Sequence, residues 1–281
     1  MVKKIRLKLW GVRGSCPAAG KEFAKYGGDT SCYEIETPEL RLIIDAGTGI
    51  RALGLKLATE KKPKPLHLFF THYHLDHICG LPHFRPLFLQ NYPINFYLPK
   101  FSAKNPKKII ENFVSAPFFP KNMKQSSAKI HFHTLPSKAH TFQLGNTKVS
   151  SLPMNHPNGS LGYRFDFFSK KSITIVSDNE ITSKNFRKMT KFCEKSDILL
   201  HDSQYTEAEY LTKIGWGHSS HTRVLEMSKN AAVKKTLLTH HDPLRNDREI
   251  DVLKRKLTYQ QDINNVMLKS QFSVQFKEFL L

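Results

Sequence analysis

The sequence has few cysteines for its 281 residues, and they are widely spaced. Cys16, Cys32, Cys79 and Cys193 form no CxxC pair. This spacing argues against a disulfide framework and against a zinc site built from thiolates. We therefore expect reduced thiols that mostly pack inside the protein.

Long hydrophobic runs are also lacking. No stretch approaches the roughly 18 consecutive apolar residues that a membrane-spanning helix needs. The first residues, MVKKIRLKLWGVRGSCP, carry positive charge like a signal peptide but lack its apolar core and its small-residue cleavage site. We expect a cytoplasmic protein with no membrane partner.

Acidic residues are scarce relative to basic ones. The chain has 24 Asp and Glu against 43 Lys and Arg, which gives a formal net charge of +19. A field of this sign concentrates anions, so the expected partner is a polyanion or a phosphorylated small molecule. The lysines are spread along the chain, and a general role in solubility is the alternative.

Short apolar or alternating runs, typical of β-strands, recur through most of the chain. They lie at 5–10, 33–36, 41–47, 66–72, 94–99, 129–133, 148–154, 163–168, 172–178, 197–202 and 235–240. Helical patterns lie late, at about 183–193, 206–213, 219–231 and 246–268. The least regular segment, 99–129, is rich in lysine and proline, and we expect it to be a surface excursion beside the site. Strands with interleaved helices predict α/β layers around two sheets.

Several candidate ligands share one position, the end of an apolar run. His72 closes LHLFFT, His156 follows VSSLPMN, Asp178 closes ITIVS, and His240 closes TLLT. Strand ends lie along one edge of a sheet, where loops converge without disturbing the core. These side chains are therefore expected to meet.

The densest group of candidate ligands is the string THYHLDH. Because side chains alternate along a strand, His72 and His74 point the same way and can bind one ion. Asp76 and His77 follow in the turn and can reach a second ion. Two cations so close need an anionic bridge, for which Asp178 is the candidate. Imidazole and carboxylate without thiolate suit zinc, and also admit manganese or iron.

The string HYHLDH resembles the HxHxDH signature of metallo-β-lactamase-fold hydrolases, and the resemblance covers most of the chain. It implies an αββα sandwich of two mixed β-sheets flanked by helices, with the metals at one edge of both sheets. We expect one such domain over residues 1–281. The resemblance places the first metal on His72, His74 and His156, the second on Asp76, His77 and His240, and the bridge on Asp178. His241 is the rival of His240, which is favoured because it directly ends KTLLT.

Two further stretches narrow the branch of the family. WGVRGSCPAAG…KYGGDTSCYEIE…RLIIDAGTGIRALG resembles the N-terminal signature of cyclic-phosphodiesterase-like members, which are related to ribonuclease Z. LLHDSQYT…GWGHSS…LLTHHDP resembles their C-terminal signature. The resemblance implies that Asp45 is a buried residue supporting the metal-loop backbone. It also implies a homodimer.

His218, in GWGHSSHTRVLEMS, is expected to be catalytic without binding metal. Ser219 or Ser220 can N-cap the following helix, which would place His218 beside free N–H groups that can bind phosphate. In related phosphodiesterases the histidine of this motif assists departure of the leaving oxygen. The alternative is a helix-entry histidine that hydrogen-bonds a carbonyl. We expect Asp76 to be a catalytic residue as well as a metal ligand.

These residues predict a dinuclear metal-dependent phosphodiesterase. A hydroxide shared by two divalent ions, zinc or manganese, would attack phosphorus while His218 protonates the leaving alkoxide. The expected substrate is a small anionic cyclic phosphodiester, namely a 3′,5′-cyclic nucleotide hydrolysed to the 5′-monophosphate. Phe118 and Phe119 are expected to stack on its base, the alternative being ordinary core packing.

The alternative function is that of a ribonuclease Z-like RNA 3′-end endonuclease, since a net charge of +19 suits a long polyanion. Three departures from the tRNA-processing enzymes favour the small substrate. Those enzymes have Asp-Cys-Gly-Glu-Gly where this chain has DAGTGIR, and a Ser, Arg and Tyr pattern where it has HHDP. The chain also lacks a Gly/Pro-rich arm for gripping tRNA. β-Lactam or thioester hydrolysis fits poorly with the phosphodiesterase-like C-terminal motifs.

Overall fold

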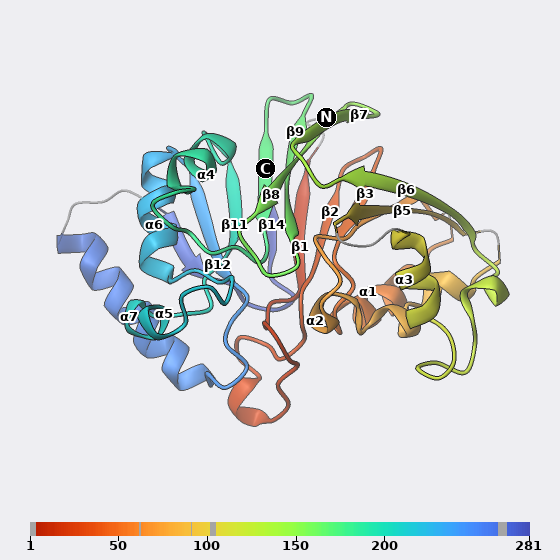
Figure 1. Cartoon of the computed structure of the whole chain (residues 1–281), viewed down its shortest axis with the longest axis horizontal. Helices are drawn as coiled ribbons and strands as arrows, with labels where there is room; N and C mark the ends of the chain where they lie inside the picture. Colours follow the sequence, from red (N-terminus) through yellow and green to blue (C-terminus); the bar gives the residue numbers. More distant parts are fainter. Residues whose placement is uncertain (1–3, 62, 91, 102–104, 264–268) are drawn as a thin grey trace.

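The chain folds into four layers, in which two seven-stranded β-sheets face each other and helices cover both outer faces (Figure 1). The computed structural model describes residues 4–61, 63–90, 92–101, 105–263 and 269–281. This architecture confirms the αββα sandwich of two mixed sheets that the sequence predicts.

The first sheet is antiparallel from β14 to β3 and parallel from β3 to β6. Its parallel strands β3 and β4 are buried along their whole length, as the continuous apolar runs predict. In spatial order the strands are β14 (Glu278–Leu280), β1 (Arg6–Gly11), β2 (Cys32–Glu36), β3 (Arg41–Ile44), β4 (Leu66–Phe69), β5 (Pro93–Lys100) and β6 (Lys129–Pro136).

The second sheet is also mixed, with antiparallel strands from β7 to β10 and parallel strands from β10 to β13. Its centre, β10 and β11, is buried on both faces. In spatial order the strands are β13 (Lys269–Phe272), β12 (Lys235–Thr239), β11 (Ile198–Asp202), β10 (Ser172–Val176), β9 (Ser160–Phe167), β8 (Thr147–Met154) and β7 (His140–Leu144).

Three apolar clusters hold the layers together. Between the sheets, Leu9 and Tyr33 of the first pack in one cluster with Phe165 and Ile175 of the second. A second cluster joins the first sheet to its covering helices α1 (Ile50–Leu57), α2 (Leu75–Ile78) and α3 (Pro106–Phe113). A third joins the second sheet to α4 (Phe186–Phe192), α6 (His221–Asn230) and α7 (Asp247–Ile263).

The late helices match the prediction, whereas the early ones are missed. α4, α5 (Glu207–Thr212), α6 and α7 lie where helical patterns are expected, although the last five residues of the expected helix 246–268 lie outside the described residues. α1 and α3 have 8 residues each and α2 has 4. Length alone does not explain which helices were missed, because the predicted helices α4 and α5 have only 7 and 6 residues. The strands missed, β7, β13 and β14, are all edge strands.

The segment 99–129 is more regular than predicted. After β5 ends at Lys100, Asn105 caps α3 by accepting a hydrogen bond from the Lys108 backbone N–H at 3.3 Å. Pro106 occupies the first turn, where its missing N–H costs nothing. Ile110 is buried against the first sheet, so the segment adds a helix to the layer that covers it.

The described residues contain neither a candidate membrane-spanning helix nor a disulfide bond. Each described helix is too short or too polar to cross a lipid bilayer. All four cysteines are free thiols, and Cys32 and Cys193 are buried.

The ends of five strands converge at one edge of the sandwich. β4 of the first sheet ends there, just before Thr71 and His72. β8, β10, β11 and β12 of the second sheet run in the same direction as one another and end at the same edge. This is the edge at which the sequence predicts the functional site.

Candidate metal centre

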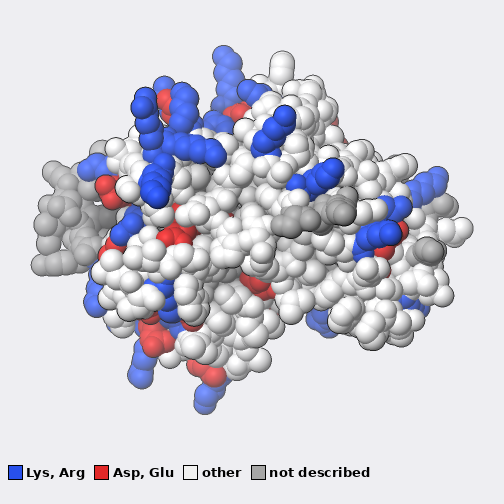
Figure 2. All heavy atoms as spheres, in the orientation of Figure 1, with Lys and Arg blue, Asp and Glu red and all other residues white. Residues whose placement is uncertain are grey.

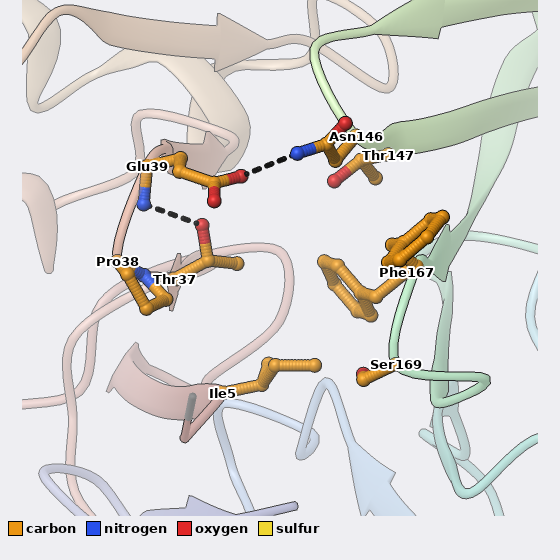
Figure 3. Close-up of a pocket in the computed structure, with 9 residues that line it drawn as sticks. Ile5, Thr37, Pro38, Glu39, Asn146, Thr147, Phe167 and Ser169 are labelled. Atoms are coloured by element: carbon orange, nitrogen blue, oxygen red, sulfur yellow. Dashed lines mark hydrogen bonds between the residues drawn. The ribbon is translucent and has the colours of Figure 1, made fainter. Parts of the chain in front are cut away.

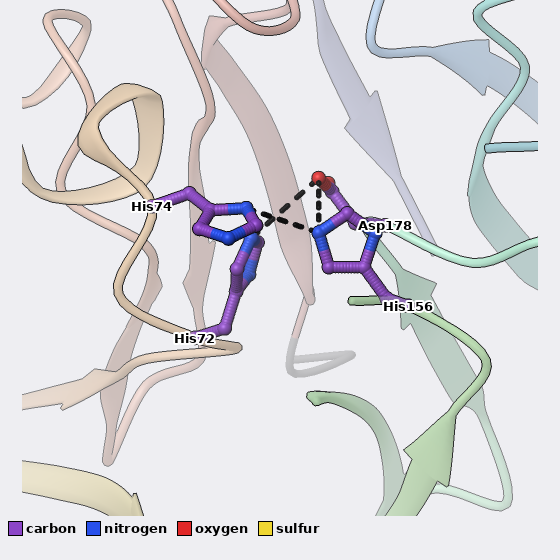
Figure 4. A group of neighbouring side chains, drawn as sticks. All are labelled: His72, His74, His156 and Asp178. Carbon is purple, nitrogen blue, oxygen red and sulfur yellow. Dashed lines mark hydrogen bonds and ion pairs between the residues drawn. The ribbon is translucent and has the colours of Figure 1, made fainter. Parts of the chain in front are cut away.

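The structure brings all seven predicted ligands into two adjoining groups. Within each group, the potential ligand atoms lie within 4.8 Å of one another. The first group is His72, His74, His156 and Asp178, whose side chains point toward one another in Figure 4. The second is Asp76, His77, Asp178 and His240. Their role as ligands stays a prediction, but their proximity is a property of the fold.

Asp178 belongs to both groups and divides its two oxygens between them. Its Oδ2 lies 3.6 Å from His72 Nε2 and 3.5 Å from His156 Nε2. Its Oδ1 lies 3.2 Å from the Nε2 atoms of His77 and His240. A carboxylate placed in this way can contact two cations at once.

The second group is closed by Asp76. Asp76 Oδ2 lies 3.1 Å from the Nε2 atoms of both His77 and His240. The same oxygen accepts a hydrogen bond from the Ser15 backbone N–H at 2.8 Å. This bond ties the N-terminal loop to the site and fixes the direction of the carboxylate.

The residues present fit two divalent cations. The Nε2 atom of His72 is buried and has no hydrogen-bond partner among the described residues. Buried polar atoms without partners are rare, and an unfilled coordination bond accounts for this one. Burial, aided by His77, holds the pKa of His72 well below its usual range, so its imidazole is neutral and can coordinate.

Outer hydrogen bonds fix the orientation of the imidazole rings. The Nδ1–H of His77 donates to Asp45 Oδ2 at 2.9 Å, and that of His240 donates to Gln204 Oε1 at 3.0 Å. The Nδ1–H of His156 donates to the Gly217 carbonyl at 3.0 Å. Each bond leaves Nε2 pointing into the cluster, which is the arrangement that metal-binding histidines need.

Asp45 is buried beneath the metal loop, as the resemblance implies. It accepts hydrogen bonds from the Thr71 backbone N–H at 2.7 Å and from the Thr71 hydroxyl at 2.8 Å. Its backbone φ of +62° lies in the left-handed region, which costs free energy for an aspartate. Burial raises the pKa of Asp45 despite the opposing effect of His77. Asp45 therefore holds both the loop backbone and one imidazole.

The carboxylates around the second group favour positive charge. Burial alone would lower the pKa of His77, but Asp76 and Asp178 outweigh it and raise that pKa well above its usual range. Burial is likewise outweighed at His240, where Asp178 and Asp76 raise the pKa to about 9. The pKa of Asp76 is lowered against burial, chiefly by His77. Two divalent cations would supply the same compensating charge.

Of the two adjacent histidines, the structure places His240 in the cluster and His241 outside it. His241 Nε2 donates to the Ser273 carbonyl at 2.8 Å, and burial lowers its pKa to about 3. His240 has a φ of +60°. Gly14 packs on its ring, where an added Cβ would lie 2.2 Å from Nδ1. The glycine is therefore needed for this close approach.

His218 lies beside the cluster and is paired with a residue that the sequence analysis missed. Its Nδ1–H donates to Asp202 Oδ2 at 3.0 Å, and its ring stacks on that of His240 at 4.9 Å between centroids. Asp202 ends the apolar run DILLHD, so the strand-end criterion could have found it. The pairing excludes the alternative in which His218 only hydrogen-bonds a carbonyl through Nδ1.

The two serines that follow His218 have internal partners. Ser220 caps α6 by accepting from the Arg223 backbone N–H at 3.4 Å. Ser219 donates its hydroxyl to the Asn179 carbonyl at 2.6 Å. Both are fully buried. Their role as substrate contacts stays a prediction that these contacts do not support.

The predicted stacking residues Phe118 and Phe119 lie in the segment after α3. Phe119 packs with the apolar cluster under the first sheet and lies 5.7 Å from the ring of His83. Phe118 is 71% exposed and stacks on Phe113. The cavity of about 380 Å³ beside the metal loop is lined by other residues, namely His72, Tyr73, His74, Phe101, Ile109, Asn158 and Gly159.

Comparisons with known proteins concern the family and the fold of the chain. The sequence profile of a beta-lactamase superfamily domain matches residues 40–241. Ribonuclease Z from Thermococcus sibiricus is 24% identical over 269 residues, which cover 78% of this chain and 79% of the relative.

Solved structures share the fold at low sequence identity. The metallo-β-lactamase fold protein YhfI from Bacillus subtilis aligns with a TM-score of 0.70 and 14% identity over 99% of this chain and 100% of its own. A diphosphatase from the PhnP family aligns with a TM-score of 0.70 and 17% identity over 98% of this chain and 97% of its own. At these identities the likeness shows the fold alone.

Proposed function

We propose that this chain, which belongs to the beta-lactamase superfamily, hydrolyses a small cyclic phosphodiester. It is a metal-dependent hydrolase of the metallo-β-lactamase fold. The proposed substrate is a 3′,5′-cyclic nucleotide, which would be opened to its 5′-monophosphate. The observation that carries the proposal is the division of the Asp178 oxygens between two groups of imidazoles.

The residues of the two groups would hold two divalent cations. Bound there, the cations would acidify a shared water to a pKa of about 7 and neutralise the phosphate oxygens. His72, His74 and His156 would hold one cation, Asp76, His77 and His240 the other, and Asp178 both. Asp45, Gln204 and the Gly217 carbonyl keep the imidazoles oriented for this task.

His218 is proposed to protonate the leaving oxygen. Because its Nδ1–H is held by Asp202, the atom left for a substrate is Nε2. Asp202 also stabilises the charge of the ring while it carries the proton that it delivers. Expulsion of O3′ from a 3′,5′-cyclic nucleotide requires such a donor, because an alkoxide is a poor leaving group.

The cavity beside the metal loop supports a small substrate. Its volume of about 380 Å³ falls within the range of roughly 300–1,000 Å³ found for small-molecule sites. Its wall includes the largely apolar side chains of Tyr73, Phe101 and Ile109. His72 and His74 of the first ligand group also line it, so the cavity adjoins the metal centre. The sugar attached to the phosphate could occupy this space.

A panel of substrates tests the proposal directly. We expect the metal-loaded protein to hydrolyse 3′,5′-cyclic nucleotides, with 2′,3′-cyclic nucleotides and a 3′-extended tRNA precursor assayed in parallel. Efficient trimming of the tRNA with the cyclic compounds left intact would reject the small substrate.

A ribonuclease Z-like activity on RNA is the second candidate, and two grooves that contain more basic than acidic residues favour it. A groove of about 580 Å³ runs from Asn155 and Asn179, the neighbours of two proposed ligands, to Lys184 and Lys188. Lys188 also lines a second groove of about 450 Å³ with Lys148, Arg164 and Lys191. Figure 2 shows basic side chains gathered over this part of the molecule. A single strand of RNA could follow the grooves, and its binding would weaken steeply with salt.

Finer properties of the enzyme are also proposed. The donor set favours zinc, with manganese as the alternative. We further propose a single domain over residues 1–281, a homodimer and a cytoplasmic location. Metal analysis after loading with each ion should find about two ions per chain, and sedimentation analysis tests the dimer.

A further inference from the structure

The loop between α5 and α6 carries a large exposed aromatic side chain, Trp216, close in sequence to His218. Trp216 is 61% exposed, and its neighbours Ile214 and Leu211 are 63% and 60% exposed. Ile214 and Trp216 lie in this loop and Leu211 in the last turn of α5, and large apolar side chains exposed in one region can form a binding surface. Trp216 precedes His218 by two residues, a stretch of chain that spans at most about 7 Å.

The loop is fixed to the metal centre by buried hydrogen bonds. The Glu180 carboxylate, two residues after Asp178, accepts from the backbone N–H groups of Gly215 at 2.8 Å and Gly217 at 3.3 Å. Glu180 is 3% exposed, and it also accepts from the Tyr210 hydroxyl at 3.0 Å. Trp216 is thus flanked by two anchored residues and is presented on a preorganised loop.

The turn itself depends on two glycines. Gly215 and Gly217 both have φ of +88°, in the left-handed region. A Cβ at Gly217 would lie 2.3 Å from His156 Nδ1, the atom that donates to the Gly217 carbonyl. The loop that carries Trp216 is therefore packed directly on a proposed metal ligand.

A cation accompanies the exposed ring. Lys213 Nζ lies 4.4 Å from the centroid of the Tyr205 ring and 5.9 Å from that of Trp216. The Tyr205 ring in turn lies 5.7 Å from the ring of His218. Aromatic and cationic groups thus continue from His218 outward, and this combination suits a planar, electron-rich ligand attached to an anion.

We propose that Trp216 is the face on which the nucleobase of the substrate stacks. The inference rests on the proposed function, because the base belongs to the nucleotide hydrolysed at the metal centre. Trp216 is two residues from His218, so a base stacked on Trp216 would lie on the side of the metal centre where His218 is proposed to protonate the leaving O3′. Phe118 and Phe119, by contrast, have no described contact with the cluster.

Inhibition by a matched pair of ligands tests the stacking. 5′-AMP and ribose 5-phosphate share the sugar phosphate and differ in the base, and both are used as inhibitors of bis(p-nitrophenyl) phosphate hydrolysis. Trp216→Ala should raise the inhibition constant of 5′-AMP about 5- to 150-fold, the range expected for one stacked base. It should not change that of ribose 5-phosphate, and Trp216→Phe should recover most of the loss.

Phe168→Ala is the matched control, because Phe168 is an aromatic residue that is 87% exposed at the other end of the molecule. It should leave both inhibition constants unchanged. Equal changes for the two ligands in Trp216→Ala, or no change for either, would overturn the stacking site.

Fluorescence separates failure of this inference from failure of the proposed function. The chain has 2 tryptophans, and the other, Trp10, is 5% exposed. 5′-AMP should quench the emission of the wild-type enzyme, ribose 5-phosphate should not, and the Trp216→Phe signal should not respond. Absence of any phosphodiester hydrolysis would reject the function, whereas absence of quenching would reject the stacking site.

Discussion

The two ends of the β-sandwich are built from the same strands but differ in how their polar groups are satisfied. At the end opposite the metal centre, which we call the closed end, turns line a small cavity of about 130 Å³ between the two sheets (Figure 3). There the Thr37 hydroxyl accepts from the Glu39 backbone N–H at 3.2 Å, and the Asn146 amide donates to Glu39 at 3.1 Å. At the metal end, the buried Nε2 atom of His72 has no such partner among the described residues.

This difference separates stability from function within one fold. At the end opposite the metal centre, polar groups that line the cavity bond to one another, and apolar side chains such as Phe167 pack between the sheets. The metal end instead holds carboxylates and imidazoles that converge on one place and are ready for a ligand. Substitutions at the two ends should therefore have different consequences.

The largest effect is expected for Asp178→Ala. Loss of the carboxylate that contacts both groups should release both cations and reduce bis(p-nitrophenyl) phosphate hydrolysis by at least about 10³-fold, as for removal of central catalytic groups. Activity and metal content per chain are the measurements. Asp197→Ala, at the closed end, is the control, because Asp197 only anchors the Ser172 backbone N–H and neighbouring lysines. Retention of both metals and full activity by Asp178→Ala would contradict the dinuclear centre.

A smaller and substrate-dependent effect is expected for His218→Ala. Loss of a general acid typically costs about 10²–10⁴-fold, and the cost should be largest for substrates with alkoxide leaving groups. We expect a much smaller loss for p-nitrophenolate, which departs without protonation. The ratio of kcat for a cyclic nucleotide to kcat for bis(p-nitrophenyl) phosphate measures the difference. An equal loss for both substrates would assign His218 a structural role.

At the closed end, Phe167→Ala should reduce stability without affecting chemistry. Phe167 is buried between the sheets and lines the small cavity. Truncation of a buried phenylalanine lowers the free energy of unfolding by about 3–5 kcal/mol. We expect about 3 kcal/mol for Phe167, because it lies near the surface. Urea unfolding gives the loss, and kcat of the folded fraction should match the wild type. A fall in kcat would mean that the two ends are coupled.

The smallest effect is a pH-dependent contribution from Glu36, where β2 reaches the closed end. Burial would raise the pKa of Glu36, but hydrogen bonds and charge from Arg6 and Arg41 lower it to about 2. A carboxylate whose pKa is lowered in the folded state stabilises the fold when the pH is above its pKa in the unfolded state, here about 4.5. This stabilisation is lost as the pH falls toward 2. We expect about 1–2 kcal/mol after allowing for solvent screening.

Thermal unfolding of wild-type protein and Glu36→Gln tests this contribution. The melting temperatures should differ at pH 7 and converge near pH 2. A constant difference across that range would show that ionisation of Glu36 is not involved.

Residues at the ends of buried strands were the most predictable part of the molecule. His72, His156, Asp178 and His240 each follow an apolar run, and the parallel course of the strands brings those ends together. Asp202 obeys the same rule but was not assigned, because the sequence does not show that it faces His218.

Groups that act through the backbone could not be predicted in this way. The Gly217 carbonyl orients His156, and the Ser15 N–H holds Asp76, although neither is distinguished by its side chain. The short helices α1 and α3 were missed because their helical character depends on packing against the first sheet. Gln204 and Glu180 likewise gain their roles only from tertiary contacts.

Each of the two ligand groups contains residues from both sheets, so a bound metal ion would link one sheet to the other. His72, His74, Asp76 and His77 follow a strand of the first sheet, whereas His156, Asp178 and His240 follow strands of the second. Sliding or parting of the two sheets would break both coordination shells at once. Each ion that binds only the closed sandwich would add about 2.7 kcal/mol at a free concentration 100 times its Kd. Without its ions the protein is therefore expected to be least stable at this edge, while the apolar cluster between the sheets still holds the sandwich together.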